Sequence, residues 1–177
     1  MPEMFVDLDD QSRLVDDVLR VRTGHLGVGG EPIPDRFHPE VQTCWDAFLR
    51  GRAKSADGRF YGVYSADVGD WVYESYDGVH QRVMHVGSAL VTLGLSQSDV
   101  TRIGIFAKNC LEWNLLEYTC YANSMMVTPL YDTFGKDAVI NIISETEMAF
   151  LFLDDEAKLA LIIERREELS QIRCHQV

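Results

Sequence analysis

Short apolar runs alternate with amphipathic stretches over the second half of the chain. Runs such as "IGIFA" and "MAFLFL" are bounded by polar turns, as buried strands are. The stretches between them repeat apolar residues every three or four positions, which is typical of helices packed on a sheet. This pattern predicts strands at residues 103–107, 125–130 and 148–153, and helices at residues 111–123, 136–145 and 156–170.

Strands that alternate with helices are joined by crossover connections, which make the strands parallel, and such crossovers are right-handed. Each run is apolar throughout, which indicates that both faces of each strand are buried. We therefore predict an α/β, doubly wound, mostly parallel sheet with flanking helices. Ligands of such sheets bind beyond the carboxyl ends of the strands.

Upstream of this sheet the pattern predicts a helix, a hairpin and a second helix. The first helix begins near Thr43, and its apolar residues are Trp45, Phe48 and Leu49. The segment "FYGVYSADVGDWVYESY" places aromatic and β-branched residues on both sides of a glycine-containing break, which predicts the hairpin. Ser75 is expected to cap the second helix and Gly94 to end it.

Residues 1–42 are predicted to form an irregular N-terminal arm. A short charged helix is expected around residues 12–21. The stretch "TGHLGVGGEPIPDRFHP" that follows is rich in glycine and proline, as long loops are. Its "GHLGVGG" resembles a dinucleotide fingerprint, but such a motif opens a helix, and Pro32 and Pro34 argue against a helix here.

Two of the helices beside the sheet have specific predicted features. Asn109 and Glu112 are three residues apart at the start of the helix at residues 111–123, which predicts a capping box. The last helix is predicted to turn one apolar side inward, made up of Leu159, Ile162, Ile163 and Leu169.

The segment "MMVTPLYDTFG" is the clearest candidate for a site. Pro129 has no N–H to donate, so the residues after it are free to leave the sheet. Tyr131, Asp132 and Thr133 then lie just past the carboxyl end of a strand, where ligands bind in such folds. A structural alternative is that Asp132 or Thr133 caps the next helix while Tyr131 and Phe134 pack under the turn. No general base, nucleophile or metal cluster accompanies this segment, so its residues alone do not indicate catalysis.

The composition narrows the function classes. The formal net charge of −12 disfavours nucleic acid and anionic lipid surfaces as partners. No apolar run approaches the roughly 18 residues of a membrane span, and the start "MPEMFVDLDDQSR" lacks the pattern of a signal peptide. These two features together lead us to expect a cytoplasmic chain. The four cysteines and five histidines are not spaced like metal ligands, so we expect reduced thiols and no metal site.

Four segments together resemble one protein family. In order, they are "DGRFYG", "DWVYESYDGVHQRVMHVGSALVTLGL", "RIGIFAKNCLEWNLLEYTCYANSMMVTPLYDTFG" and "AVINIISETEMAFLFLD". They are similar to the N-terminal part of long-chain fatty acyl-CoA synthetases, members of the AMP-forming adenylating superfamily. The resemblance covers about residues 43–153. The run from Asn109 to Trp113, followed by Pro-Leu-Tyr-Asp-Thr, is specific to the long-chain branch.

The resemblance implies activation of a fatty acid through acyl-AMP to acyl-CoA, with ATP, Mg and CoA taking part. It also implies that residues 43–177 form an incomplete N-terminal subdomain of an AMP-binding domain. The sequence contains no Ser/Thr/Gly-rich loop followed by lysine, no Tyr-Gly-x-Thr-Glu segment and no C-terminal lysine domain. We therefore expect an N-terminal fragment that binds none of these cofactors and is inactive on its own.

No catalytic residue can be taken from the resemblance, but it makes Tyr131, Asp132 and Thr133 expected neighbours of the acyl or nucleotide cleft. Several members of the family associate with membranes, so peripheral attachment to the endoplasmic reticulum or another membrane is an alternative to a purely cytoplasmic location. A different function also stays open, namely a short non-catalytic subunit or scaffold that binds a complete synthetase.

Overall fold

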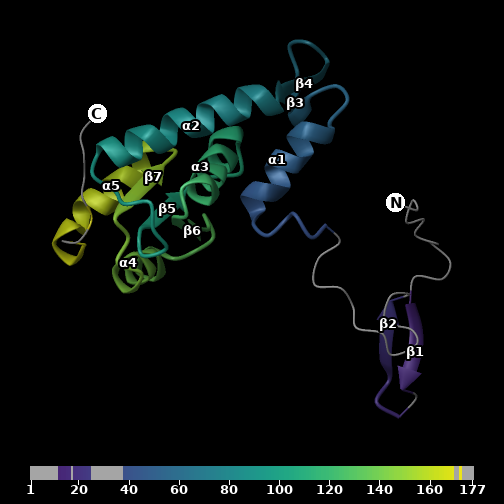
Figure 1. Cartoon of the computed structure of the whole chain (residues 1–177). Coiled ribbons are helices and arrows are strands. Elements are labelled where there is room, and N and C mark those ends of the chain that lie inside the picture. Colours follow the sequence, from purple (N-terminus) through teal and green to yellow (C-terminus); the bar gives the residue numbers. More distant parts are fainter. Residues whose placement is uncertain (1–11, 17, 25–37, 170–171, 173–177) are drawn as a thin grey trace. The chain divides into compact units, whose positions relative to one another are not determined.

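The computed structural model describes residues 12–16, 18–24, 38–169 and 172 (Figure 1). The chain divides into two units, Met1–Glu40 and Val41–Val177. Residues 25–37, which hold most of the glycine- and proline-rich stretch and of its dinucleotide-like motif, lie outside the described residues.

The first unit contains an antiparallel pair of strands, β1 (Ser12–Asp16) and β2 (Val21–Gly24). The helix predicted around residues 12–21 is therefore wrong. Asp16 is the physical reason, because its Oδ1 accepts hydrogen bonds from the backbone N–H groups of Val18 and Leu19 at 2.9 and 2.7 Å. An aspartate that bonds to the backbone just after it stabilises a turn in competition with a helix.

Within the described residues, the second unit contains a parallel sheet of three strands in the order β6-β5-β7 (Figure 1). The strands are β5 (Arg102–Phe106), β6 (Met126–Leu130) and β7 (Phe150–Leu153). The helices that connect or follow them are α3 (Leu111–Ala122), α4 (Lys136–Glu145), α5 (Glu156–Glu164) and a short 3₁₀ helix (Arg166–Glu168). The predicted parallel α/β sheet is confirmed.

The elements before the sheet also agree with the prediction. They are α1 (Cys44–Lys54), β3 (Arg59–Ser65), β4 (Asp70–Ser75) and α2 (Tyr76–Thr92). Strands β3 and β4 pair in antiparallel fashion as the predicted hairpin. Ser75 caps α2 by accepting a hydrogen bond from the backbone N–H of Gly78 at 3.0 Å. Gly94 follows the end of α2 with a φ of +87°, a conformation that favours glycine.

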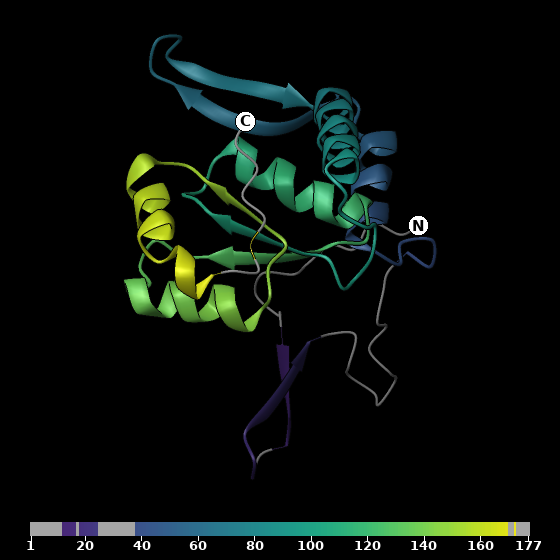
Figure 2. The same cartoon turned by 90° about the vertical axis from the view of Figure 1, so that its left-hand side faces the viewer.

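Helices cover both faces of the sheet, which makes the fold doubly wound. On one face, Phe106 and Leu130 pack against Val139 of α4 and Ile162 of α5. On the other face, Ile103 packs in a separate cluster, whose other buried members are Leu90, Leu95, Cys120 and Met125. Figure 2 shows α3 and α4 on opposite sides of the strands. Burial on both faces explains why the strands are mostly apolar, with Arg102 at the start of β5 and Thr128 in β6 as polar exceptions.

The predicted capping box of Asn109 and Glu112 is wrong. Helix α3 begins one residue later than such a box requires, with Cys110 as its N-cap and no side-chain capping bond. Glu112 instead forms an ion pair with Arg82 of α2, with a distance of 3.4 Å between the nitrogen and the oxygen. Spacing alone could not separate these two uses of the same carboxylate.

A capping box does occur at α1. Thr43 Oγ1 accepts a hydrogen bond from the Asp46 backbone N–H at 3.0 Å, and Asp46 Oδ2 accepts one from the Thr43 N–H at 2.9 Å. Thr43→Ala is expected to lower the free energy of unfolding by about 1 kcal/mol, since one backbone donor loses its partner. Asn109→Ala serves as the control and should change it by less than about 0.5 kcal/mol. Urea unfolding of both variants measures the difference, and equal losses would contradict these cap assignments.

The inward side of α5 agrees with the prediction at Ile162 and differs from it at Leu159 and Ile163. Its buried residues are Lys158, Leu161 and Ile162, whereas Leu159 and Ile163 are exposed. Leu169 is buried as predicted, but it follows the 3₁₀ helix and is not part of α5 itself. Lys158 therefore lies on the inward side of α5, where the apolar pattern predicted only apolar residues.

Candidate functional site

The carboxyl ends of the three parallel strands meet at one edge of the sheet. Strand β5 is central, and its helix α3 lies on the face opposite to α4 and α5. Neighbouring strands whose following helices leave on opposite faces leave a crevice between their ends. Because β5 has such a neighbour on each side, two crevices are expected at this edge.

Two cavities lie at this edge. One, of about 250 Å³, lies beside the ends of β5 and β6 and is lined by Ala107, Lys108, Asn109, Trp113, Pro129, Leu130, Tyr131, Asp132 and Thr133. The other, of about 390 Å³, lies beside the ends of β5 and β7 and is lined by Ile105, Ala107, Cys110, Glu112, Trp113, Leu116, Phe152, Leu153 and Asp154. Trp113 contributes to both cavities. We call the first one the β6 cavity and the second one the β7 cavity.

The structure brings Tyr131, Asp132 and Thr133 together in the wall of the β6 cavity. The structural alternative for these residues is wrong in its details, because Gly135 is the N-cap of α4 and no side chain caps that helix. Tyr131 and Phe134 are both exposed and contact each other edge to face, with ring centroids 5.3 Å apart. The loop therefore presents its side chains to the cavity and to solvent.

Asp132 has a partner that the sequence analysis missed, the buried Lys158 of α5. The Lys158 ammonium lies 2.6 Å from Asp132 Oδ1 and 2.5 Å from Asp154 Oδ1, and its side chain is only 10% exposed. Asp155 Oδ2 is 3.7 Å away, and the ammonium also lies 4.9 Å from the centroid of the Phe106 ring. One cation thus contacts residues at the ends of all three strands.

Asp154 connects this cluster to the central strand. Its Oδ2 accepts a hydrogen bond from the backbone N–H of Lys108 at 2.8 Å, while its Oδ1 accepts one from Lys158. These two bonds hold the pKa of Asp154 below its usual value, and the bond from the Lys108 backbone has the larger effect. Burial of the ammonium lowers the pKa of Lys158, but its hydrogen bonds to Asp132 and Asp154 outweigh that effect and raise it. The lysine and Asp154 are therefore both charged at neutral pH.

A sequence signal for this cluster exists, although it is weak. Asp154 and Lys158 are four residues apart, which allows an ion pair on one helical turn. Lys158 is also the single basic residue within α5, between apolar neighbours. Its contact with Asp132 could not be inferred, because that residue belongs to a loop on the other side of α4.

The acidic side chains at this edge are engaged with a cation of the chain itself. Asp132 and Asp154 already bind Lys158, and no group of three or more His, Cys, Asp or Glu side chains in the described part of the chain could hold a metal. Lys108 is the one basic residue among those lining the two cavities, and it lies close to acidic ones. No described helix is long and apolar enough to cross a membrane.

A doubly wound parallel sheet with cavities at its carboxyl edge places the chain in the α/β class, and comparison with known proteins identifies its family. The sequence model of the AMP-binding enzymes matches residues 52–177, so this chain belongs to that family. Within it, the chain is 38% identical to long-chain-fatty-acid–CoA ligase 1 of Cavia porcellus over 132 residues, which cover 74% of this chain and 19% of the ligase. It is 33% identical to long-chain-fatty-acid–CoA ligase 5 of Rattus norvegicus over 164 residues, or 93% of this chain and 23% of the ligase.

Solved structures agree with this fold. Acetoacetyl-CoA synthetase from Streptomyces lividans matches with a TM-score of 0.62 at 17% identity, over 80% of this chain and 24% of that one. An anthranilate CoA ligase in complex with anthranoyl-AMP matches with a TM-score of 0.63 at 16% identity, over 76% of this chain and 24% of that one. The resemblance inferred from the sequence segments is confirmed, and the chain spans about a fifth of the length of the curated relatives it matches.

Proposed function

We propose that residues 43–177 act as part of the N-terminal subdomain of an ATP-dependent long-chain fatty acid–CoA ligase. Such a ligase joins a fatty acid to AMP and then transfers the acyl group to CoA. The observation that carries this proposal is the 38% identity to a long-chain-fatty-acid–CoA ligase over 74% of the chain. In this proposal the 177 residues are inactive alone, because the phosphate-binding loop and the C-terminal lysine belong to other parts of such an enzyme. We further propose a cytoplasmic location. Fractionation of the source cells tests the alternative, in which the protein is recovered with the membranes.

Tyr131, Asp132 and Thr133 form one wall of the substrate cleft in this proposal. Three observations support it: these residues line one cavity, the cavity lies at the carboxyl end of a parallel strand, and the loop exposes its side chains. The adjoining β7 cavity is lined largely by apolar side chains such as Ile105, Leu116 and Phe152. An edge that combines polar and apolar linings suits a substrate with a charged head and a long hydrocarbon chain.

A chimera tests the proposed activity. Residues 43–177 replace the matching segment of the Cavia porcellus ligase, and the formation of acyl-CoA from a long-chain fatty acid, ATP and CoA is measured. We expect the chimera to retain activity within about tenfold of the parent ligase. A tenfold loss would correspond to about 1.4 kcal/mol in the activation barrier. The isolated 177-residue chain should give no acyl-CoA. A folded but inactive chimera would argue against the ligase and favour a non-catalytic subunit.

The cleft assignment is tested in the same chimera with a matched pair of tyrosines. Tyr131 and Tyr64 are both exposed, and each contacts one aromatic ring edge to face, Phe134 and Trp71 respectively. Tyr131→Ala is expected to lower kcat/KM by about tenfold or more, because it removes a wall of the cleft. Tyr64→Ala, on the β3–β4 hairpin, should leave kcat/KM within about twofold. Equal effects of the two substitutions on kcat/KM would show that Tyr131 is not part of the substrate cleft.

A further inference from the structure

The burial of Lys158 calls for an explanation beyond packing. Lysine is among the residues that are almost never buried unless they are paired, because removing an ammonium from water is costly. Here the pairing partners come from two different strand ends: Asp132 follows β6, and Asp154 follows β7. A lysine that served only α5 would need no contact with the loop after β6.

That loop has few contacts of other kinds. The backbone N–H of Phe134 donates to the Tyr131 carbonyl at 3.0 Å, which is a bond within the loop itself. The side chains of residues 131–134 are exposed or face the β6 cavity. Pro129, near the end of β6, has no N–H for the ladder. The ion pair between Asp132 and Lys158 therefore ties the loop to a helix on the sheet.

We propose that Lys158 is a positioning residue, which fixes Asp132 and thereby holds residues 131–133 as the wall of the β6 cavity. The same ammonium holds Asp154, whose other oxygen accepts a hydrogen bond from the backbone N–H of Lys108, a residue that also lines that cavity. Lys158 thus sets the separation of the two loops that border the cavity. Its consequence for acyl activation rests on the proposed ligase function, whereas its effect on the loop does not.

Charge adds a second part to this role. Without the ammonium, Asp132 and Asp154 would face each other as uncompensated carboxylates, and like charges at short distance repel. The loop after β6 would then move away from the end of β7. The fatty acid carboxylate and the phosphates of ATP are also anionic, so the same two aspartates would repel them. Lys158 weakens both effects, since its positive charge offsets one of the two negative charges.

Amide hydrogen exchange of the 177-residue chain tests the positioning role without any enzymatic assay. Lys158→Met keeps the length of the side chain and removes its charge. We expect exchange in the peptide that covers residues 131–135 to become about tenfold faster, as for the loss of a hydrogen bond to a charged group. Lys136→Met, an equal change of charge at the exposed start of α4, is the control and should leave that exchange unchanged. Lys158→Arg should restore most of the protection.

Unchanged exchange in residues 131–135 of a folded Lys158→Met variant would overturn the proposal. An equal loss of protection in β5 and in this loop would also overturn it, because Lys158 would then only support the core. If Lys158→Met does not fold, Asp132→Ala breaks the same contact at the exposed loop. It should also accelerate exchange there by about tenfold, and no acceleration would count against the proposal.

In the active chimera, Lys158→Met is expected to lower kcat/KM by about tenfold to a hundredfold, because small displacements of groups around a substrate are costly. Recovery by Lys158→Arg separates positioning from a specific need for lysine. Faster exchange with unchanged kcat/KM would support the contact between Lys158 and the loop, but it would show that residues 131–133 do not form a wall of the substrate cleft. An inactive parent chimera would count against the ligase function alone, since the exchange result stands independently.

Discussion

Phe48→Ala is expected to lower the free energy of unfolding by about 3–5 kcal/mol, the usual cost of removing a buried phenylalanine. Phe48 is only 3% exposed, and it is the one fully buried residue of α1. Its ring lies within about 5 Å of four aromatic rings, at centroid distances of 4.9 Å to Trp45, 5.2 Å to Phe60, 5.3 Å to Tyr76 and 5.0 Å to Tyr118. These rings come from α1, β3, α2 and α3, so the loss would weaken the packing of α1 against three other elements.

The control for this prediction is Leu49→Ala. Leu49 follows Phe48 in the same helix, and the sequence pattern assigned both to its apolar side, but Leu49 is 36% exposed. Its replacement should cost less than about 1 kcal/mol. Urea unfolding followed by circular dichroism gives both values. A loss below about 1 kcal/mol for Phe48→Ala would show that α1 is not held by this aromatic cluster.

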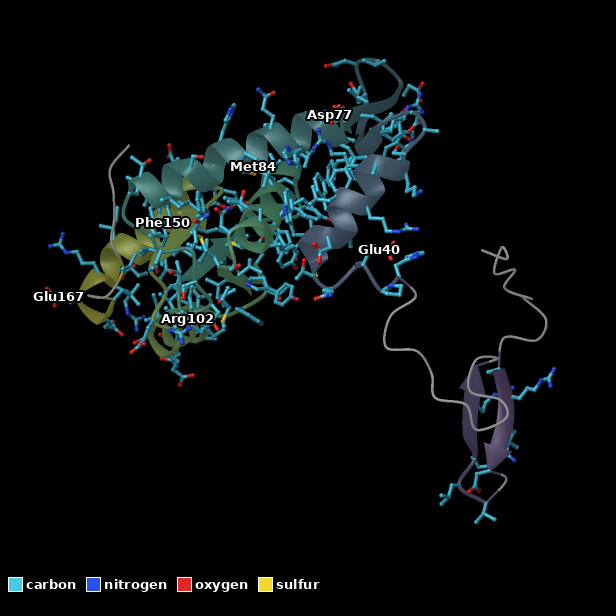
Figure 3. All side chains as sticks on the ribbon, in the orientation of Figure 1. Glu40, Asp77, Met84, Arg102, Phe150 and Glu167 are labelled. Carbon is cyan, nitrogen blue, oxygen red and sulfur yellow. The ribbon has the colours of Figure 1, made fainter. Side chains whose placement is uncertain are left out.

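The aromatic cluster also explains why α1 and the hairpin belong to the same unit as the sheet. Side chains fill the space between α1, α2 and α3 (Figure 3). Phe48 and Leu115 are both buried in this cluster, together with Val79 and Val83 of α2. Aromatic rings bury large areas and prefer tilted or edge-on contacts, which four elements meeting at angles can supply.

The strands and helices of the sheet could be predicted because their signals are local. Helix α4 has the bounds that the apolar spacing predicts, and strand β6 differs by one residue at its start. The strands are short and mostly apolar because helices cover both faces of the sheet. The position of residues 131–133 at the edge of the sheet follows from the same order of elements.

The errors arise where a local pattern allows two structures and one particular contact, near in the sequence or distant, selects between them. Residues 12–21 could form a helix or a hairpin, and the bonds of Asp16 to the next backbone groups select the hairpin turn. Glu112 could cap α3 or pair with another helix, and Arg82 selects the second. Lys158 was missed for the same reason, because its partner Asp132 lies 26 positions away in the sequence.

The error at α5 leads to the other large effect, expected for Ile162→Ala. Apolar residues occur on more than one side of this helix, so periodicity could not choose the inward side between Ile162 and Ile163. In the structure Ile162 is 5% exposed, in the cluster with Phe106 and Leu130, whereas Ile163 is 55% exposed. Ile162→Ala should lower the free energy of unfolding by about 2–5 kcal/mol, because it removes buried methyl groups and leaves a cavity.

Ile163→Ala is the matched control, since it makes the same chemical change one residue further along α5. It should change the free energy of unfolding by less than about 0.5 kcal/mol. The comparison reports the rotation of α5 on the sheet, and with it the direction of Lys158, which shares the inward side with Ile162. Similar losses for the two isoleucines, or a larger loss for Ile163, would mean that α5 is rotated. The Lys158 ammonium would then not reach Asp132.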